Sequence, residues 1–217
     1  IAIFFCFYPS RGGIAQVNAN LLSELGKEHE VRAFNFTRQY PSFLFPGKTQ
    51  YVTAEDEAVP VESMALLDTA NPFTWRKTAR EIAKWQPDVL IMRYWMSYFA
   101  PSLGSVSRKM PKGCVRIGIL DNVVPHEPHF FDAPLTRWYL KSLDGAVTLC
   151  DEVAQDLMAL RKDIPHTTIP HPTYTHFGEA ISKSEAEDLL GIPHVEGSRT
   201  LLFFGLIREY KGLDVLI

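Results

Sequence analysis

The stretch Ile-Ala-Ile-Phe-Phe-Cys-Phe-Tyr-Pro-Ser-Arg-Gly-Gly-Ile, residues 1–14, decides the fold of this chain. Its first seven residues are apolar, which predicts a strand over residues 1–7 that is buried on both faces of a sheet. Gly12 and Gly13 follow, and apolar residues then recur at helical spacing as far as Gly26, which predicts a helix. A strand, a glycine turn and a helix in this order open a parallel α/β sheet.

The rest of the chain repeats this alternation. Short apolar runs alternate with stretches of helical period, so we predict an α/β fold: a Rossmann-like, doubly wound parallel sheet with helices on both faces. Further strands are expected over residues 30–36, 88–93, 114–120, 144–149, 166–169 and 200–205. Further helices are expected from Asn71 as N-cap to just before Pro87, over residues 98–110, 134–142 and 151–161, and after Ser184, whose spacing to Glu187 fits a capping box.

Composition narrows the class of protein. The 217 residues are 46% hydrophobic and carry a net charge of −3, which argues against a nucleic-acid surface. No apolar stretch has the length of a membrane span, and the apolar start lacks the basic flank and cleavage site of a signal peptide. The three cysteines lie in or at the end of apolar runs without metal-like spacing. These features favour a cytoplasmic protein with reduced thiols.

The loop that contains Gly12 and Gly13 is the first candidate site. A glycine turn between a strand and a helix is where open α/β sheets bind ligands, and paired glycines let backbone amides face an anion. The loop lacks the dinucleotide fingerprint because Gln16 stands where the third small residue would be, which disfavours hydride transfer. The alternative is a tight turn that needs positive φ angles and has no ligand.

A second glycine turn lies near the end of the sequence, in Leu-Leu-Phe-Phe-Gly-Leu-Ile-Arg-Glu-Tyr-Lys-Gly, residues 201–212. An apolar strand is expected to end at Gly205, and Arg208 and Lys211 precede a new apolar helix. Two cations beside a glycine and a helix N-terminus favour a phosphate or diphosphate ligand. The alternative is that both are solvated charges at a surface turn. Because the sequence stops inside the new helix, we expect it to be a piece of a longer protein.

A third candidate follows the strand expected over residues 114–120. The segment Asp-Asn-Val-Val-Pro-His-Glu-Pro-His, residues 121–129, places several polar groups where ligand-facing loops of this architecture lie. Asp121, His126 or both could bind a ligand. The alternative is that Asp121 and Asn122 cap a turn while His126 packs under Phe130. The spacing of His126, Glu127 and the last His follows no zinc pattern, so we assign no metal.

These motifs together resemble glycosyltransferase family 4, the retaining sugar transferases of GT-B architecture. The ending is similar to the family turn F-G-x-[IL]-R-x-Y-K-G, and the first loop is similar to its P-x-x-G-G loop. The segment that begins at Asp121 is similar to the family motif H-[DN]-x-x-P-H-E, although Asp121 stands where the family has its first His. The resemblance implies an acceptor-side domain over residues 1–197 and the first strand and turn of a donor-side domain over residues 198–217.

The resemblance also implies an activity. This is transfer of a sugar from a nucleoside diphosphate sugar to a saccharide or lipid-linked acceptor, with retention, in bacterial cell-surface polysaccharide synthesis and without a metal or other cofactor. Arg208, Lys211 and the amides of Gly12 and Gly13 would hold the diphosphate. The acidic motif of the family's donor domain does not occur in this sequence, so we expect these 217 residues alone to be inactive.

Five further residues are candidates for the acceptor side. Arg93, Tyr94 and Trp95 lie at the end of the strand expected over residues 88–93, where aromatic faces suit sugar rings, although a Trp after a strand is at least as often a core residue. Asn122 and Glu127 belong to the polar segment after the next strand and would line the same acceptor cleft.

Phe43, Leu44 and Phe45 stand in a row between prolines, in a segment that resembles one found in a subset of bacterial family members. They could reach a lipid-linked acceptor or make a peripheral contact on the inner face of the membrane. The reading we favour is that they fold back onto the edge of the sheet.

Two other functions remain open at this point. One is a sugar-nucleotide epimerase or a phosphorylase of the same architecture. The other is a non-catalytic nucleotide-binding module, in which the glycines and the turn with Arg208 and Lys211 hold a nucleotide for regulation.

Overall fold

The computed structural model describes residues 1–41, 49–53, 58–125, 128–172, 178–195, 197, 199–204, 207 and 211–217. The chain divides into two compact units, Ile1–Pro172 and Thr173–Ile217, and each is treated by itself below. The domain boundary expected between residues 197 and 198 stays a prediction.

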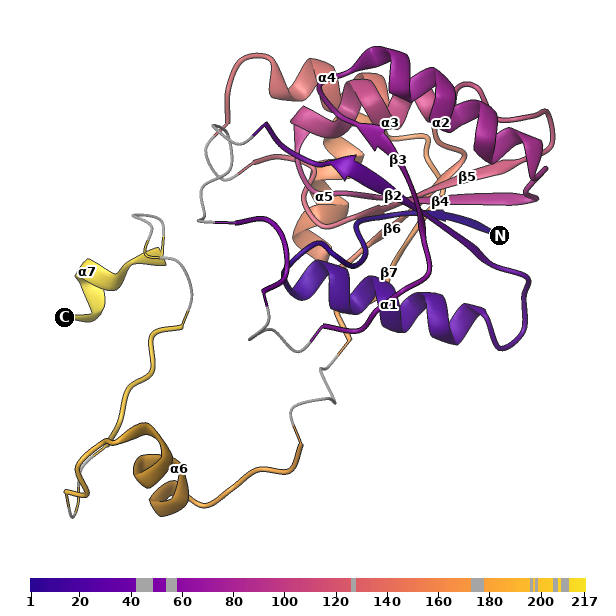
Figure 1. The fold of residues 1–217 in the computed structure, drawn as a ribbon. Coiled ribbons are helices and arrows are strands. Elements are labelled where there is room, and N and C mark those ends of the chain that lie inside the picture. Colours follow the sequence, from indigo (N-terminus) through magenta and orange to yellow (C-terminus); the bar gives the residue numbers. More distant parts are fainter. Residues whose placement is uncertain are drawn as a thin grey trace. The chain divides into compact units, whose positions relative to one another are not determined.

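The first unit is built on a seven-stranded sheet (Figure 1). Its strands are β1 (Ala2–Phe4), β2 (Arg32–Arg38), β3 (Met64–Asp68), β4 (Val89–Tyr94), β5 (Val115–Leu120), β6 (Gly145–Thr148) and β7 (His166–Thr168). The order is β3-β2-β1-β4-β5-β6-β7, and every neighbouring pair is parallel. The predicted Rossmann-like, doubly wound α/β fold is confirmed.

Helices cover both faces of this sheet. They are α1 (Gly13–Leu25), α2 (Pro72–Lys84), α3 (Ala100–Ser107), α4 (Asp132–Leu140) and α5 (Asp151–Leu160), with a short 3₁₀ turn, η2 (Ser97–Phe99), before α3. Figure 1 shows α1 on one side of the sheet and α2, α3 and α4 on the other. The helix predicted to begin with Asn71 as N-cap is confirmed, because the Asn71 side chain accepts a hydrogen bond from the Phe73 amide.

The core follows from the strand β1 and its continuation. Ile3 and Phe5 pack toward α1, while Phe4 and Cys6 face the larger cluster that α2 to α5 cover. Side chains of both faces are therefore buried, as a central parallel strand requires, and this explains the unbroken apolar run at the start of the sequence.

One strand of the first unit was missed. β3 is an edge strand, paired only with β2, and Met64 at its start is 42% exposed. The segment Met64–Asp68 has a short apolar run, but Met, Ala and Leu favour helix and none of them is β-branched or aromatic, so its strand signal is weak. The predicted strands at β2, β4, β5, β6 and β7 are confirmed within two residues at each end.

The second unit contains α6 (Lys183–Leu190) and α7 (Leu213–Leu216). A capping box begins α6, but it joins Ser182 to Glu185 and so lies two residues before the predicted one. The strand predicted over residues 200–205 is wrong for residues 200–204, which have no regular structure. A parallel strand needs a hydrogen-bonded neighbour, and the described residues of this unit contain no other strand.

In the part of the chain that the structure describes, no helix has both the length and the apolar character that crossing a bilayer would require. Phe43, Leu44 and Phe45, proposed for a membrane contact, lie outside the described residues.

Candidate functional site

The candidate site lies where the strand order of the sheet reverses direction. From β1 the chain proceeds through β2 to β3 on one side, and then returns to β4 on the other side of β1. Open α/β sheets bind their ligands at the carboxyl ends of the strands beside such a reversal, which here are the ends of β1 and β4. The loop with Gly12 and Gly13 follows β1, and the segment that begins at Asp121 follows β5.

Gly12 is the N-cap of α1 and sets how this helix begins. Its φ is 113° and its ψ is 170°, a conformation that L side chains rarely adopt. A Cβ at Gly12 would meet no described atom within 4 Å, so the space beside the helix end is open. The amides of Gly13 and Ile14 come before the first intrahelical hydrogen bond, which the Ala15 amide donates to the Gly12 carbonyl.

The electrostatics of this helix end favour an anion. No acidic residue stands in the first turn of α1, and no described side chain forms a capping hydrogen bond there. The positive end of the helix dipole is therefore not neutralised by the residues that the structure describes around it. Gly12 and Gly13 are both exposed, so a phosphate could reach their amides directly.

The loop between β1 and α1 is held from below by Asn35, which is 1% exposed. The side-chain Nδ2 of Asn35 donates to the carbonyl oxygens of Phe7 (3.3 Å) and Tyr8 (3.0 Å), and its side-chain oxygen accepts from the backbone amide of Phe7 (3.2 Å). The loop is also held from the side, because the Val52 amide donates to the Pro9 carbonyl at 2.9 Å. These bonds fix the backbone that leads into Gly12.

A buried ion pair joins the carboxyl ends of β4 and β5. Arg93, the penultimate residue of β4, donates from Nε and Nη2 to the two carboxylate oxygens of Asp121 at 2.7 and 2.6 Å. Its Nη1 donates to the side-chain oxygen of Asn18 on α1 at 2.8 Å, and the Asn18 amide donates to the Cys6 carbonyl at 2.8 Å. The network ties together α1, β4 and the segments that follow β1 and β5.

This network changes the roles expected of Arg93 and Asp121. The Arg93 side chain is 2% exposed, so it positions Asp121 and Asn18 and presents no cation to an acceptor. The Asp121 side chain keeps 15% exposure, and each of its oxygens has a second lone pair free of Arg93. Asp121 can therefore still accept a hydrogen bond from a ligand hydroxyl, held in one orientation by Arg93.

Tyr94 belongs to the core and not to the surface of the site. It has no exposed area, its hydroxyl lies 2.7 Å from the Thr136 hydroxyl, and its ring stacks on Tyr139. Burial raises the pKa of Tyr94. The assignment of Tyr94 to an acceptor cleft is corrected, because the last residue of β4 points into the larger hydrophobic cluster.

Trp95 is half-buried and forms part of an aromatic wall near the end of β4. Its ring lies 4.3 Å from Phe99, and its indole Nε1 donates to the Tyr40 hydroxyl at 2.7 Å. Tyr40 in turn stacks on Tyr98 with the ring centroids 5.9 Å apart. Burial raises the pKa of Tyr40, so its phenol remains protonated at neutral pH.

Cys6 lies beside the network without being a nucleophile. It is 4% exposed, and burial raises the pKa of its thiol to about 12 although the Arg93 charge acts in the opposite direction. The thiolate is the reactive form of cysteine, so Cys6 is unreactive at neutral pH.

The remaining predicted residues are not all placed. Asn122 is half-buried next to Asp121, while His126, Glu127 and Arg208 lie outside the described residues. Lys211 is exposed and precedes Gly212, whose φ of 64° begins α7 in the second unit. No group of His, Cys, Asp and Glu side chains suited to a metal is found in the described ranges, and the prediction of a metal-free reaction stays a prediction.

The sequence did not lead us to predict two residues that support the candidate site, Asn18 and Asn35. Both are buried polar residues, at 0% and 1% exposure. Asn18 lies four residues after Ile14 on the helix face that carries Leu21 and Leu22, so its position on an apolar face was a detectable signal. Asn35 gave a similar signal, because it interrupts the apolar strand Arg32–Arg38.

Comparison with protein-family models gives no match for this chain, and comparison with curated proteins gives no significant match. The functional argument therefore rests on the geometry of the site and on the motifs of the sequence.

Proposed function

We propose that this chain binds the diphosphate of a nucleoside diphosphate sugar at the N-terminus of α1, as part of a retaining glycosyltransferase that transfers the sugar to a saccharide or lipid-linked acceptor. One observation carries the proposal. Gly12, with a φ of 113°, begins α1 after the carboxyl end of β1 without an acidic neighbour in the first turn, and no described atom fills the space beside it.

The physical chemistry of the reaction agrees with this site. A departing nucleoside diphosphate gains negative charge as the bond to the sugar breaks, and amides already fixed by the fold stabilise that charge without reorganisation. Asn35 provides this fixation, since it holds the backbone of Phe7 and Tyr8 in the loop that leads to Gly12.

Asp121 is our candidate for the polar group that contacts the sugar or the acceptor hydroxyl. Its two oxygens are oriented by Arg93, and its 15% exposure leaves room for one hydrogen bond from a ligand. Trp95, half-buried in the aromatic wall, is our candidate for an aromatic contact with a sugar. His126, Asn122 and Glu127 remain candidates from the sequence resemblance.

The same resemblance supplies the rest of the proposal. Arg208 and Lys211 would add cationic contacts to the diphosphate, and the acceptor would belong to bacterial cell-surface polysaccharide synthesis at the cytoplasmic face of the membrane. Domains over residues 1–197 and 198–217 belong to this proposal as well.

Binding of nucleoside diphosphates tests the proposal directly. We expect a nucleoside diphosphate to bind about tenfold more tightly than the matching monophosphate, because the second phosphate adds a charge at the helix N-terminus. Titration calorimetry with UDP, GDP and ADP and their monophosphates measures this difference. The bound diphosphate should be displaced by the matching nucleotide sugar.

The variant Gly12→Val should weaken that binding about tenfold, since a side chain at positive φ reshapes the helix start and fills the open space. Gly113→Val is the matched control, because Gly113 has a φ of 93° and equally open surroundings but lies in the turn before β5. Equal binding by Gly12→Val and Gly113→Val would refute the site.

A further inference from the structure

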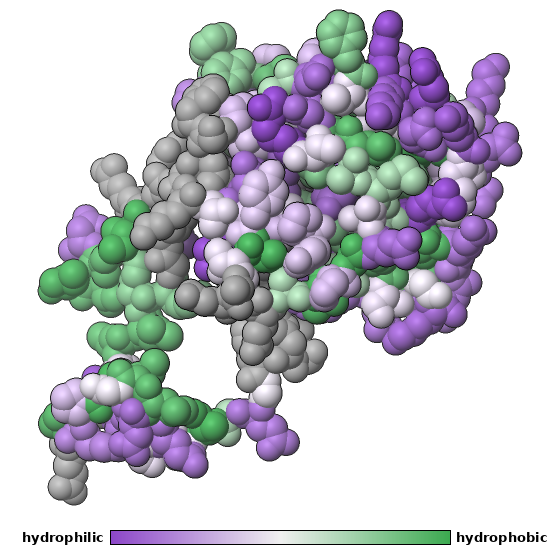
Figure 2. Space-filling view, in the orientation of Figure 1, coloured by the Kyte–Doolittle hydropathy of each residue, from purple (hydrophilic) through white to green (hydrophobic). Residues whose placement is uncertain are grey.

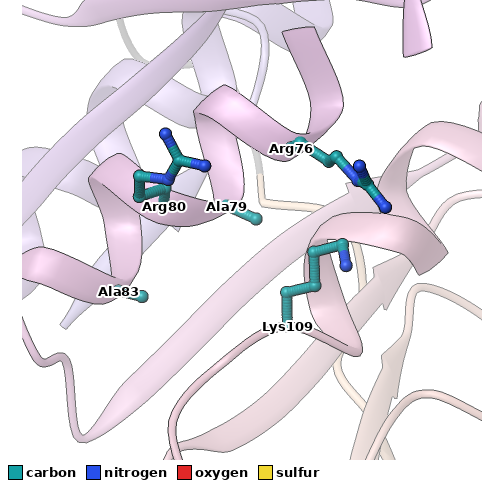
Figure 3. A pocket seen from close by; sticks show the side chains of 5 residues that line it. All are labelled: Arg76, Ala79, Arg80, Ala83 and Lys109. Atoms are coloured by element: carbon teal, nitrogen blue, oxygen red, sulfur yellow. The ribbon is translucent and has the colours of Figure 1, made fainter. Parts of the chain in front are cut away.

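A basic cavity lies between α2 and the turn that follows α3, away from the proposed nucleotide site. It has a volume of about 320 Å³ and is lined by Arg76, Ala79, Arg80, Ala83 and Lys109. Figure 3 shows the Arg76 and Lys109 side chains reaching toward each other from the two elements, with Arg80 one turn further along α2. We call this cavity the α2/α3 pocket.

The hollow exists because of the spacing of small residues on α2. One face of α2 carries two arginines and two alanines, spaced three or four residues apart: Arg76, Ala79, Arg80 and Ala83. Ala79 is 1% exposed and packs on the core, while Ala83 is half-buried. Methyl groups at these two positions leave open the space that larger side chains would fill where α2 meets α3.

The three cations of the pocket are exposed and lack a salt-bridge partner within the described part of the chain, although Glu81 has a weaker Coulombic interaction with Arg80. No carboxylate there forms a salt bridge with Arg76, Arg80 or Lys109. Glu81, the acid next to Arg80 in sequence, is bonded to Lys84 at 2.8 Å. Figure 2 shows strongly hydrophilic side chains gathered over α2.

This arrangement costs the free protein energy. Arg76 and Arg80 are like charges at i and i+4, which destabilises a helix slightly. Lys109 adds a third positive charge from another element. An anion in the pocket would reduce this repulsion, which water and counterions screen in the free protein.

We propose that the α2/α3 pocket binds a phosphate group that carries two or more negative charges. Guanidinium groups donate paired hydrogen bonds that match phosphate oxygens, and a third cation favours a multiply charged anion over a single carboxylate. A volume of about 320 Å³ is at the lower end of the range for small-molecule sites and can hold a diphosphate or a phosphomonoester headgroup.

This pocket is independent of the proposed nucleotide site. Figure 1 shows α2 and α3 on one side of the sheet and α1, which Gly12 begins, on the other. A phosphate anion bound at the α2/α3 pocket therefore belongs to a second ligand or to a headgroup, and the failure of one site leaves the other standing.

Titration with inorganic pyrophosphate at low salt tests the pocket, because screening weakens exposed cations. The Gly12→Val variant serves as the reference protein, so that the N-terminus of α1 does not contribute. In this background we expect Arg76→Gln with Lys109→Gln to weaken binding at least about tenfold, since each charged hydrogen bond contributes about that factor.

The matched control is Lys77→Gln with Lys112→Gln. It removes the same charge from α2 and from the turn after α3, but neither residue lines the pocket. This pair should change binding less than about twofold. Filling the hollow with Ala83→Leu, which keeps every cation, should weaken binding as much as removing the charges.

Two arms separate the sources of the phosphate. Vesicles of phosphatidylcholine with and without phosphatidic acid present the group as a lipid headgroup, and cosedimentation measures binding. Capture by the phosphatidic acid vesicles that is lost in Arg76→Gln with Lys109→Gln supports a headgroup, and pyrophosphate binding without capture supports a soluble phosphate compound. Absence of both, or equal losses in the two double variants, overturns the proposal.

Discussion

Replacing Arg93 by Met is expected to lower the free energy of unfolding by about 3 to 5 kcal/mol, the loss typical of breaking a buried ion pair from one side. Arg93 is 2% exposed, and its removal leaves the Asp121 carboxylate and the Asn18 side-chain oxygen without the donors that satisfy them. Urea denaturation followed by circular dichroism measures the change.

Arg116 provides a matched control for this variant. It bonds Asp144 with the same two distances, 2.7 Å from Nε and 2.6 Å from Nη2, but the two side chains are 31% and 41% exposed. Arg116→Met should therefore cost no more than about 1 kcal/mol. Equal losses for Arg93→Met and Arg116→Met would show that burial of the first pair has no energetic role.

The double variant Arg93→Met with Asp121→Leu sharpens this test. Replacing both partners by apolar residues removes the uncompensated charge, so stability should recover to within about 1 to 2 kcal/mol of the parent protein. Binding of the nucleotide sugar should not recover, because Asp121 is the group that we assign to the sugar or the acceptor hydroxyl. Recovery of both would place Asp121 outside the site.

Replacing Asn35 by Ala is expected to lower the free energy of unfolding by about 3 kcal/mol and to weaken nucleotide binding as well. The Asn35 side chain pairs the Phe7 amide and the Tyr8 carbonyl, and each buried group left unpaired costs about 1 to 3 kcal/mol. The Phe7 carbonyl keeps a second bond, from the Ser10 amide at 2.8 Å. Movement of the loop would let water bond the unpaired groups and so reduce the loss of stability. The same movement would displace Gly12 and weaken nucleotide binding.

Two other asparagines provide controls for this variant. Asn71→Ala removes the N-cap of α2 and should cost about 1 kcal/mol, while Asn20→Ala changes an exposed residue and should lie within about 0.5 kcal/mol of the parent. Neither should alter nucleotide binding. If Asn35→Ala behaves like Asn71→Ala in both stability and binding, Asn35 does not anchor the loop.

The fold could be predicted from the sequence because its central strands bury both faces. The apolar runs at β1, β4 and β5 leave few alternatives, and Asn71 with Pro72 marks the start of α2 by local chemistry alone. The edge strand β3 was missed because its apolar residues are Met, Ala and Leu, which favour helix over strand.

The candidate site could be predicted only where its signal is local. Gly12 and Gly13 follow directly from their place between a strand and a helix. The bond between Arg93 and Asp121 joins residues 28 positions apart and depends on β4 and β5 being neighbours. Arg93 ends one predicted strand and Asp121 follows another, so their contact can be predicted once the order of the strands in the sheet is known. The sequence around either residue does not indicate that the pair is buried.

The most direct measurement is amide NMR of the chain during titration with a nucleoside diphosphate. The amides of Gly13 and Ile14 are expected to show the largest shift changes, because they have no intrahelical acceptor and face the open end of α1. The Asn35 amide should shift less, because Asn35 supports the loop, and the Asp121 amide should shift less, because Asp121 is assigned to the sugar or the acceptor and not to the diphosphate. Shift changes confined to Arg76, Arg80 and Lys109, or an unchanged spectrum around Gly12 at saturating ligand, would contradict a nucleotide site at the start of this helix.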